Sequence, residues 1–175
     1  MGRRTREMFF LLRALDLQPR RVEVLRSAAV CAAATRSWEQ ACRLWVRVLD
    51  ITPDAPDAWA QLALSEQARG RLESASHAWT HAAELQPDAA PFQFNMGVVK
   101  GRLGDRAGAY AAFEKAVELD PGHARAWANL GVMRRQSGDV GGAEVSLRRA
   151  LGLRPNYALA LANLAGVLET LGNHQ

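Results

Sequence analysis

Prolines recur at one fixed interval along nearly the whole chain. Five of the seven prolines in the 175 residues are spaced 34 residues apart: Pro19, Pro53, Pro87, Pro121 and Pro155. Two further series keep the same interval: Gly70, Gly104, Gly138 and Gly172, and Ala41, Ala75, Ala109 and Ala143. A fixed period in this range is typical of folds that stack copies of one structural unit. The repeat therefore constrains the fold more than any other feature of the sequence.

Each period predicts two amphipathic helices and a turn. In the copy at 124–157, apolar residues recur at intervals of three and four, first around Trp127 and Leu130 and again around Leu147. Gly138 lies between the two groups, where the chain has to reverse and often needs a positive φ. Pro155 follows the second group and stops its helix. A helix of about 13 residues is marginal alone, so neighbouring copies have to hold it in place.

These ladders resemble the tetratricopeptide repeat, with its W-x2-L-G, G, A-x3-F, A and P pattern. The resemblance implies an all-α, right-handed superhelical solenoid of antiparallel helix pairs with a 34-residue period. We expect one solenoid over 1–175. Its parts are an unpaired second helix in 3–21, four full repeats at 22–55, 56–89, 90–123 and 124–157, and an unpaired first helix in 158–175.

The sequence departs from the family pattern at several positions of the first helices. Leu25 and Ala28 replace the usual Trp and Leu in the first repeat, and Gln93 replaces Trp in the third. The family's common Tyr is absent from all five first helices, where its position reads Ala32, Glu66, Lys100, Arg134 and Leu168. These changes leave the expected fold intact and alter the chemistry of the surface that the first helices line.

Residues that could carry catalysis have simpler structural explanations. His77 and His81 lie one helical turn apart, but no carboxylate or Cys completes a metal site, so we expect a solvated face. Cys31 and Cys42 are expected to be buried free thiols. The segment GRLGDRAG at 101–108 lacks the Lys of a phosphate-binding loop and fits the turn between two helices. Most of the five Trp residues lie on core ladders. We therefore expect no enzyme, no metal and no cofactor.

Charge and hydropathy favour a soluble chain of the cytoplasm. The net charge of +4 comes almost wholly from Arg, and no apolar stretch approaches the ~20 residues that span a bilayer. Arg13 and Asp16 interrupt the apolar run near the N-terminus, which argues against a signal peptide. Six arginines near that end leave nucleic acid or an anionic membrane as an open but unfavoured alternative, to be tested by salt dependence: Arg3, Arg4, Arg6, Arg13, Arg20 and Arg21.

The resemblance places a partner in the concave groove lined by first helices. The ninth position of each repeat is small or apolar although it should be exposed, and arginines accompany it. Such a groove suits a protein segment that is acidic and partly apolar, while tight helix packing is the alternative reason for these residues. The expected groove residues are Val30, Leu64, Phe94, Asn95, Val98, Arg102, Arg125, Asn129, Val132, Arg135 and Asn163.

Three of these residues, Asn95, Asn129 and Asn163, form a ladder of amides at the repeat interval. A row of amides can grip the backbone of an extended peptide whatever its side chains, because each offers one acceptor and two donors. The ladder is similar to the one that lines the repeats of the O-linked N-acetylglucosamine transferases. Packing beside a tight helix crossing is an equally good reason for it. Lys is missing from the places where chaperone-binding members carry it, so chaperone tails are not expected partners.

The sequence thus predicts a non-enzymatic protein–protein interaction scaffold that binds a partner segment in its groove. The alternative is a substrate-recruiting module or fragment of a larger enzyme, such as a glycosyltransferase or sulfotransferase, which sequence beyond Gln175 would reveal. Apolar residues in the two unpaired helices, such as Phe9, Phe10, Leu161 and Leu168, also predict head-to-tail self-association.

Overall fold

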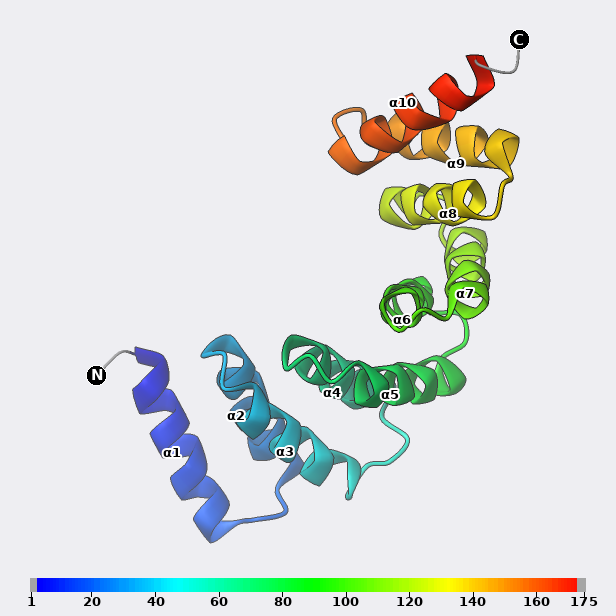
Figure 1. Ribbon diagram of the computed structural model, residues 1–175. Helices are drawn as coiled ribbons and strands as arrows, with labels where there is room; N and C mark the ends of the chain where they lie inside the picture. The colour runs from blue at the N-terminus through cyan, green and yellow to red at the C-terminus, as the bar shows by residue number, and fades with distance from the viewer. Residues whose placement is uncertain (1–2, 173–175) are drawn as a thin grey trace. The chain divides into compact units, whose positions relative to one another are not determined.

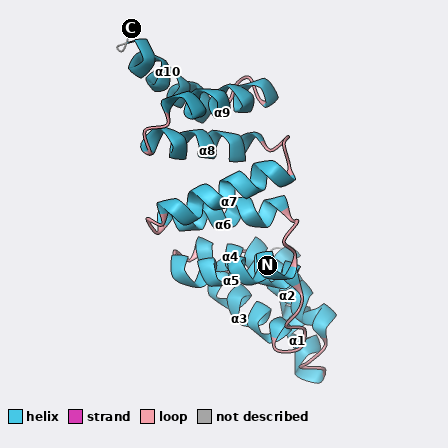
Figure 2. Ribbon diagram, turned by 90° about the vertical axis from the view of Figure 1, so that its right-hand side faces the viewer, coloured by secondary structure: helices cyan, strands magenta, loops and turns pink. Residues whose placement is uncertain are grey.

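The computed structural model describes residues 3–172, with side chains from residue 6 onward, and this part of the chain is helical with no strand (Figures 1 and 2). Consecutive helices fold back on one another, and the predicted all-α fold of antiparallel pairs is confirmed. The helices are α1 (Arg3–Leu17), α2 (Val22–Ala34), α3 (Trp38–Leu49), α4 (Pro56–Ala68), α5 (Leu72–Leu85), α6 (Ala90–Arg102), α7 (Arg106–Leu119), α8 (Ala124–Gln136), α9 (Val140–Leu153) and α10 (Ala158–Gly172).

The chain forms two compact units, Met1–Pro87 and Asp88–Gln175. Their boundary falls two residues before the predicted start of the repeat at 90–123. In the first unit α1 packs on α2, α2 on α3, α3 on α4 and α4 on α5. In the second unit α6 packs on α7, α7 on α8, α8 on α9 and α9 on α10, and α8 also touches α10.

Turns between paired helices require the left-handed backbone conformation that the glycine ladder predicts. Gly70, Gly104 and Gly138 have φ angles of 79°, 84° and 87°. Arg36 holds the same place in the first repeat and has a φ of 59°, although a β-carbon disfavours that conformation. The geometry of the repeat therefore persists where its glycine has been lost.

Small residues in the first helices face bulky residues in the second helices. A β-carbon added to Gly97 of α6 would lie 2.8 Å from Cε1 of Phe113 in α7. A β-carbon added to Gly131 of α8 would lie 2.7 Å from Cγ of Leu147 in α9. The two ladders interlock because the bulky side chain fills the space that the glycine leaves. This close approach explains why the sequence keeps both ladders in register.

Tryptophans play two different structural roles. Trp45 and Trp79 are buried in the core of the first unit, as their ladder predicts. Trp59 and Trp127 are only half-buried, and each indole N–H donates to the carbonyl of the proline that ends the previous repeat, over 2.7 Å to Pro53 and 3.0 Å to Pro121. The Trp and Pro ladders are therefore linked by a hydrogen bond between consecutive repeats.

None of the helices in the described residues is long and apolar enough to cross a membrane.

Candidate functional site

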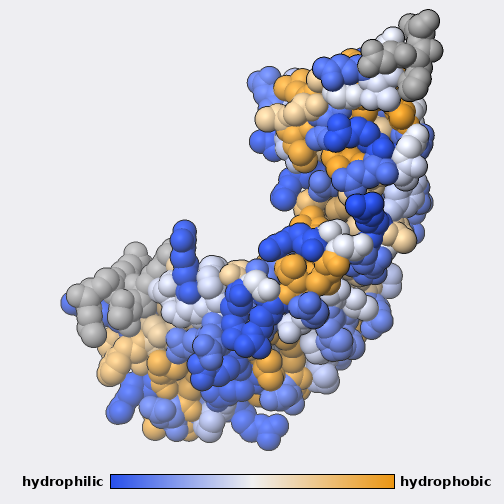
Figure 3. Space-filling model, viewed as in Figure 1, coloured by the Kyte–Doolittle hydropathy of each residue, from blue (hydrophilic) through white to orange (hydrophobic). Residues whose placement is uncertain are grey.

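A groove of about 560 Å³ lies in the second unit, lined by first helices, the turns beside them, and Arg106 and Phe113 of the second helix α7. Four of the predicted residues line it: Val98, Arg102, Arg125 and Asn129. Lining residues that the sequence did not single out include Arg106, Met133, Gln136, Tyr157 and Leu159. Most of these lie at the ends of helices, outside the ladder positions. In Figure 3, hydrophobic and hydrophilic side chains alternate over the visible surface of the second unit and of the first unit.

Phe94 lies in the core, although the sequence placed it in the groove. Its side chain is 3% exposed and its ring centroid lies 5.9 Å from that of Phe113 and 4.6 Å from that of His123. The guanidinium of Arg125 covers the ring, 4.7 Å from its centroid. Arg125 is thus fixed by the phenylalanine beneath it, and this cation–π contact orients a positive charge at the groove.

The groove of the second unit carries positive charge that the described chain does not neutralise. Among the described residues, the guanidinium groups of Arg102, Arg106 and Arg125 form no ion pair and no hydrogen bond, and no acidic residue lines the groove. Arg134 of α8 behaves differently, since its Nη2 lies 3.7 Å from Oε1 of Glu114 and its Nε lies 3.9 Å from Oδ2 of Asp139. Arg134, which packs between helices, is paired with acidic residues, whereas the arginines that line the groove are available to bind a ligand.

The three asparagines of the predicted ladder differ in how their amides are used. The Nδ2 of Asn95 donates to the carbonyl of Pro91 over 2.9 Å, and the Nδ2 of Asn163 donates to the carbonyl of Leu159 over 2.8 Å. Asn129 makes no hydrogen bond to the described chain through its side chain and lines the groove. The side-chain amide of Asn129 can therefore donate and accept hydrogen bonds fully to a ligand. Asn95 and Asn163 each already use one amide N–H in a hydrogen bond to their own helix.

The remaining predicted residues of the second unit lie around this groove. Val98 and Val132 are half-buried, and Val98 packs against the core beneath the groove floor. Arg135 is exposed on α8, and a β-carbon added to Gly166 of α10 would lie 2.8 Å from its Nη1. The glycine at this ninth position gives the arginine room to lie across α10.

The first unit has a groove of about 680 Å³ with different chemistry. Val30 lines it and is 55% exposed, and Leu64 on the neighbouring first helix is 43% exposed, so both apolar side chains reach the surface as predicted. Arg26 also lines this groove, but it forms an ion pair with Asp57, and Glu7 lines the same groove. The positive charge of Arg26 is therefore balanced by acidic residues of the same groove.

His77 on α5 is exposed, as the sequence suggested, whereas His81 is less solvated than expected. His81 is half-buried and stacks on Trp59 with ring centroids 4.6 Å apart, and His77 contacts His81 edge-on at 4.5 Å. Trp59 thus covers part of the face that was expected to be solvated. Within the described residues, no group of three or more His, Cys, Asp or Glu side chains is placed to hold a metal ion.

Both cysteines are buried thiols outside any disulfide, as the sequence predicted. Burial raises the pKa of the Cys42 thiol to about 11, and a hydrogen bond to Glu66 contributes to this rise, although Arg69 opposes it. A thiol with a raised pKa stays protonated near neutral pH and is a poor nucleophile.

The position of the family's common Tyr is here taken by Glu66, whose Oε1 pairs with Nη1 of Arg69 at 3.2 Å.

Comparisons with known proteins agree with this architecture. The family model for the tetratricopeptide repeat matches residues 94–158. No curated protein sequence matches the chain at a significant level. Among solved structures, YrrB, described as a TPR protein with an unusual peptide-binding site, has a TM-score of 0.81 and 23% identity, with 91% of this chain and 82% of that chain covered.

Two further structures share the fold. MamA has a TM-score of 0.81 at 20% identity, covering 86% of this chain and 88% of that chain. The first TPR of Spaghetti (RPAP3), bound to the HSP90 peptide SRMEEVD, has a TM-score of 0.64 at 20% identity, covering 67% of this chain and 93% of that chain. Residues 94–158 therefore contain tetratricopeptide repeats, and the rest of the chain carries the same 34-residue ladders and shares the fold of these solved structures.

Proposed function

We propose that the chain is a non-enzymatic interaction scaffold whose second unit binds an acidic, partly apolar segment of a partner protein in the groove lined by Val98, Arg102, Arg125 and Asn129. Two of the similar structures are described by their peptide sites or peptide ligands, which supports a peptide as the class of partner. Of the proteins compared, the RPAP3 domain holds a peptide with two consecutive glutamates.

Three arginines line one groove without an acidic neighbour among the described residues that line it, beside the apolar surface of Val98, Met133 and Leu159. Guanidinium groups bind carboxylates in a bidentate manner, and electrostatic complementarity sets which partners are steered to a surface. The balanced charges of Arg26, Asp57 and Glu7 make the groove of the first unit a poorer site for an acidic segment.

Replacing Asn129 by Ala tests whether the groove holds a peptide backbone. Peptides are first selected from a displayed random library on the whole chain, and their affinity is measured by fluorescence anisotropy. Asn129→Ala should lose about 1–3 kcal/mol of binding free energy, since peptide groups that faced the amide are left unpaired. Asn95→Ala should lose less, because its amide already donates to Pro91. The melting temperature should hardly change in either variant.

Asn156→Ala is the matched control, because Asn156 is exposed in the loop before α10 and does not line the groove. The proposal fails if the selected peptides bind Asn129→Ala and Asn156→Ala as tightly as the wild-type protein. Equal losses of affinity and of melting temperature at Asn129 would assign this amide to packing instead.

Substrate recruitment for a larger glycosyltransferase or sulfotransferase would use the same groove and remains the second proposed role. The buried thiols of Cys31 and Cys42 agree with a reducing compartment, and the cytoplasm is the proposed location. Nucleic acid binding draws no support from the exposed Arg6 and Arg13, and the side chains of Arg3 and Arg4 lie outside the described residues.

Head-to-tail self-association is a separate proposal, supported by exposed apolar side chains on two helices. Phe9 and Phe10 of α1 are exposed, as are Leu161 and Leu168 of α10. Light scattering over a wide concentration range should show wild-type protein growing in mass while Leu168→Asp stays monomeric. If both proteins remain monomeric at high concentration, the proposal is wrong. Glu7 of α1 lies 34 residues before Ala41, at the ladder position where other second helices carry Ala. Its charge opposes the packing of α1 against α10 of another molecule.

A further inference from the structure

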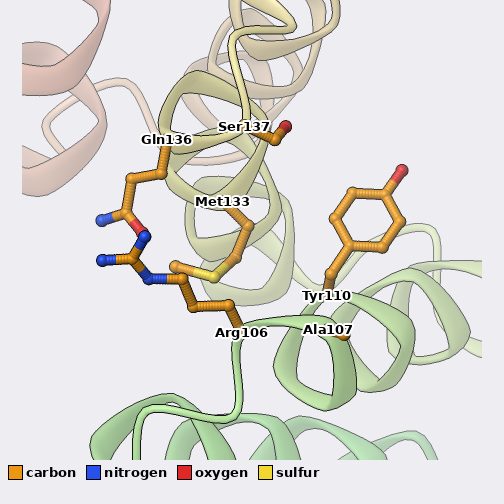
Figure 4. Close-up of a pocket in the computed structure, with 6 residues that line it drawn as sticks. All are labelled: Arg106, Ala107, Tyr110, Met133, Gln136 and Ser137. Carbon is orange, nitrogen blue, oxygen red and sulfur yellow. The ribbon is translucent and has the colours of Figure 1, made fainter.

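A second hollow of the second unit opens beside the groove. It has a volume of about 460 Å³ and lies between the first turns of α7 and the C-terminal end of α8 (Figure 4). Arg106, Met133 and Gln136 line both this hollow and the groove, so the two are continuous. We call it the anchor pocket, and its lining residues are Arg106, Ala107, Tyr110, Met133, Gln136 and Ser137.

The lining combines an apolar interior with a polar rim. In Figure 4 the side chains of Arg106 and Gln136 point toward one another on one side of Met133, while the ring of Tyr110 stands on the other side. Met133 and Tyr110 both pack against the core of the unit and are half-buried. A methionine adapts its shape to what it contacts and its sulfur favours aromatic rings. The interior of the pocket therefore suits a bulky apolar side chain.

A chain of polar contacts holds the wall of the anchor pocket. The Tyr110 hydroxyl donates to Oε1 of Glu114 over 3.1 Å, and Nη2 of Arg134 lies 3.7 Å from that same oxygen. Arg134 in turn donates from Nη1 to the hydroxyl of Ser146 in α9 over 2.9 Å. The polar end of Tyr110 is thus satisfied within the protein, and its ring is fixed before any ligand arrives. Such preorganisation lowers the entropic cost of binding.

We propose that the anchor pocket receives one bulky apolar side chain, aromatic or long aliphatic, from the acidic segment that binds the neighbouring groove. This inference rests on the proposed function and adds the feature that would select one acidic segment over another. Charge complementarity identifies the occupant, because Arg106 stands where the pocket meets the groove and no acidic residue lines either among the described residues. Charge alone discriminates poorly between acidic segments, whereas a filled pocket near the centre of an interface contributes strongly to affinity.

Filling the anchor pocket from within tests this inference. Ala107 is exposed on α7 and lines the pocket, so Ala107→Trp places a large ring in it without entering the core. Ala111 is exposed one turn further along α7 and does not line the pocket, which makes Ala111→Trp the matched control. Random peptides displayed on phage are selected on the wild-type chain and on both variants, after their melting temperatures have been shown to agree.

Wild type and Ala111→Trp should enrich acidic peptides that carry one bulky apolar residue at a fixed distance from the acidic residues. Ala107→Trp should still enrich acidic peptides but lose the fixed apolar residue. Replacing this residue by Ala in a selected peptide should weaken binding to wild type by about 10- to 100-fold and should leave binding to Ala107→Trp unchanged.

A second variant keeps the test independent of the tryptophan substitution. Met133→Ala enlarges the interior of the pocket, and the selected apolar residue should become larger. Acidic peptides without a fixed apolar residue, or with one that Ala107→Trp retains, would overturn the anchor pocket and leave the groove proposal standing. Peptides without any acidic preference would overturn both.

Discussion

Replacing Gly131 by Leu is expected to destabilise the second unit by about 1–3 kcal/mol, because overfilling a packed interface forces neighbouring side chains and backbone apart. A β-carbon here already meets Cγ of Leu147 at 2.7 Å and the carbonyl oxygen of Ala143 at 3.3 Å. Ala143→Leu, on the opposite side of the same crossing, should act in the same direction. Hydrogen exchange followed by mass spectrometry measures the effect, and peptides from α8 and α9 should exchange faster than in wild type.

Gly141→Leu is the matched control for this substitution. Gly141 lies in the first turn of α9 and an added β-carbon meets no atom within 4 Å. The variant should be as stable as wild type or gain up to about 1 kcal/mol, because Leu is a better helix former than Gly. Unchanged exchange in Gly131→Leu, or equal losses in both variants, would show that the repeat register assigned to α8 and α9 is wrong.

Reversing two groove charges should abolish most binding of acidic peptides. The double variant Arg102→Glu, Arg125→Glu turns two attractive contacts into repulsive ones, and we expect a loss of about 2–3 kcal/mol, or roughly 30- to 150-fold in affinity. Folding should survive, because Arg102 and Arg125 form no ion pair within the described residues, although Arg125→Glu removes the cation–π contact with Phe94. Arg125 also lies in the first turn of α8, where an acidic side chain is favourable. Anisotropy titrations at low and high salt measure the loss.

Arg148→Glu, Arg149→Glu makes the same change in net charge on the exposed surface of α9, away from the groove. This control should bind the selected peptides nearly as well as wild type at moderate salt, since exposed charges beyond about 10 Å are screened. Equal losses in both double variants would show that net charge, and not the groove, attracts the peptides.

Ladders of small, bulky and turn-forming residues were sufficient to predict the fold. Gly131 and Leu147 interlock because each occupies a ladder position whose physical requirement is local: one helix must come close and the other must fill the gap. The turn at Arg36 shows how strong this requirement is, since its φ of 59° matches the glycine turns without a glycine. Such positions recur every 34 residues, and recurrence makes them visible in a single sequence.

The chemistry of the grooves was only partly predictable, because it depends on contacts between different repeats. Phe94 occupies a groove position by register, yet Phe113 and His123 from the next two elements accommodate its ring in the core. Arg26 counts as a groove cation until Asp57 of α4 pairs with it. These contacts do not follow the 34-residue period, so the repeat pattern of the sequence does not predict them.

The anchor pocket was missed for a related reason. Tyr110 and Gln136 lie near the start of a second helix and the end of a first helix, outside the positions that repeat most regularly. Their closeness follows from how α7 and α8 pack, and the sequence gives no spacing rule for it. The sequence feature that could have indicated the pocket is the presence of large side chains, such as Tyr110 and Met133, near the ends of neighbouring helices.

Site-specific photo-crosslinking shows where on the second unit an acidic peptide binds. A benzophenone amino acid is introduced at Val98, on the floor of the groove, or at Val145, which is 65% exposed on α9 and does not line the groove. Each protein is irradiated with a selected acidic peptide at a concentration that saturates wild type. Binding in the groove should give a crosslinked product from Val98 and none from Val145. Crosslinking from Val145 alone, or from both positions equally, would contradict binding in the groove of the second unit.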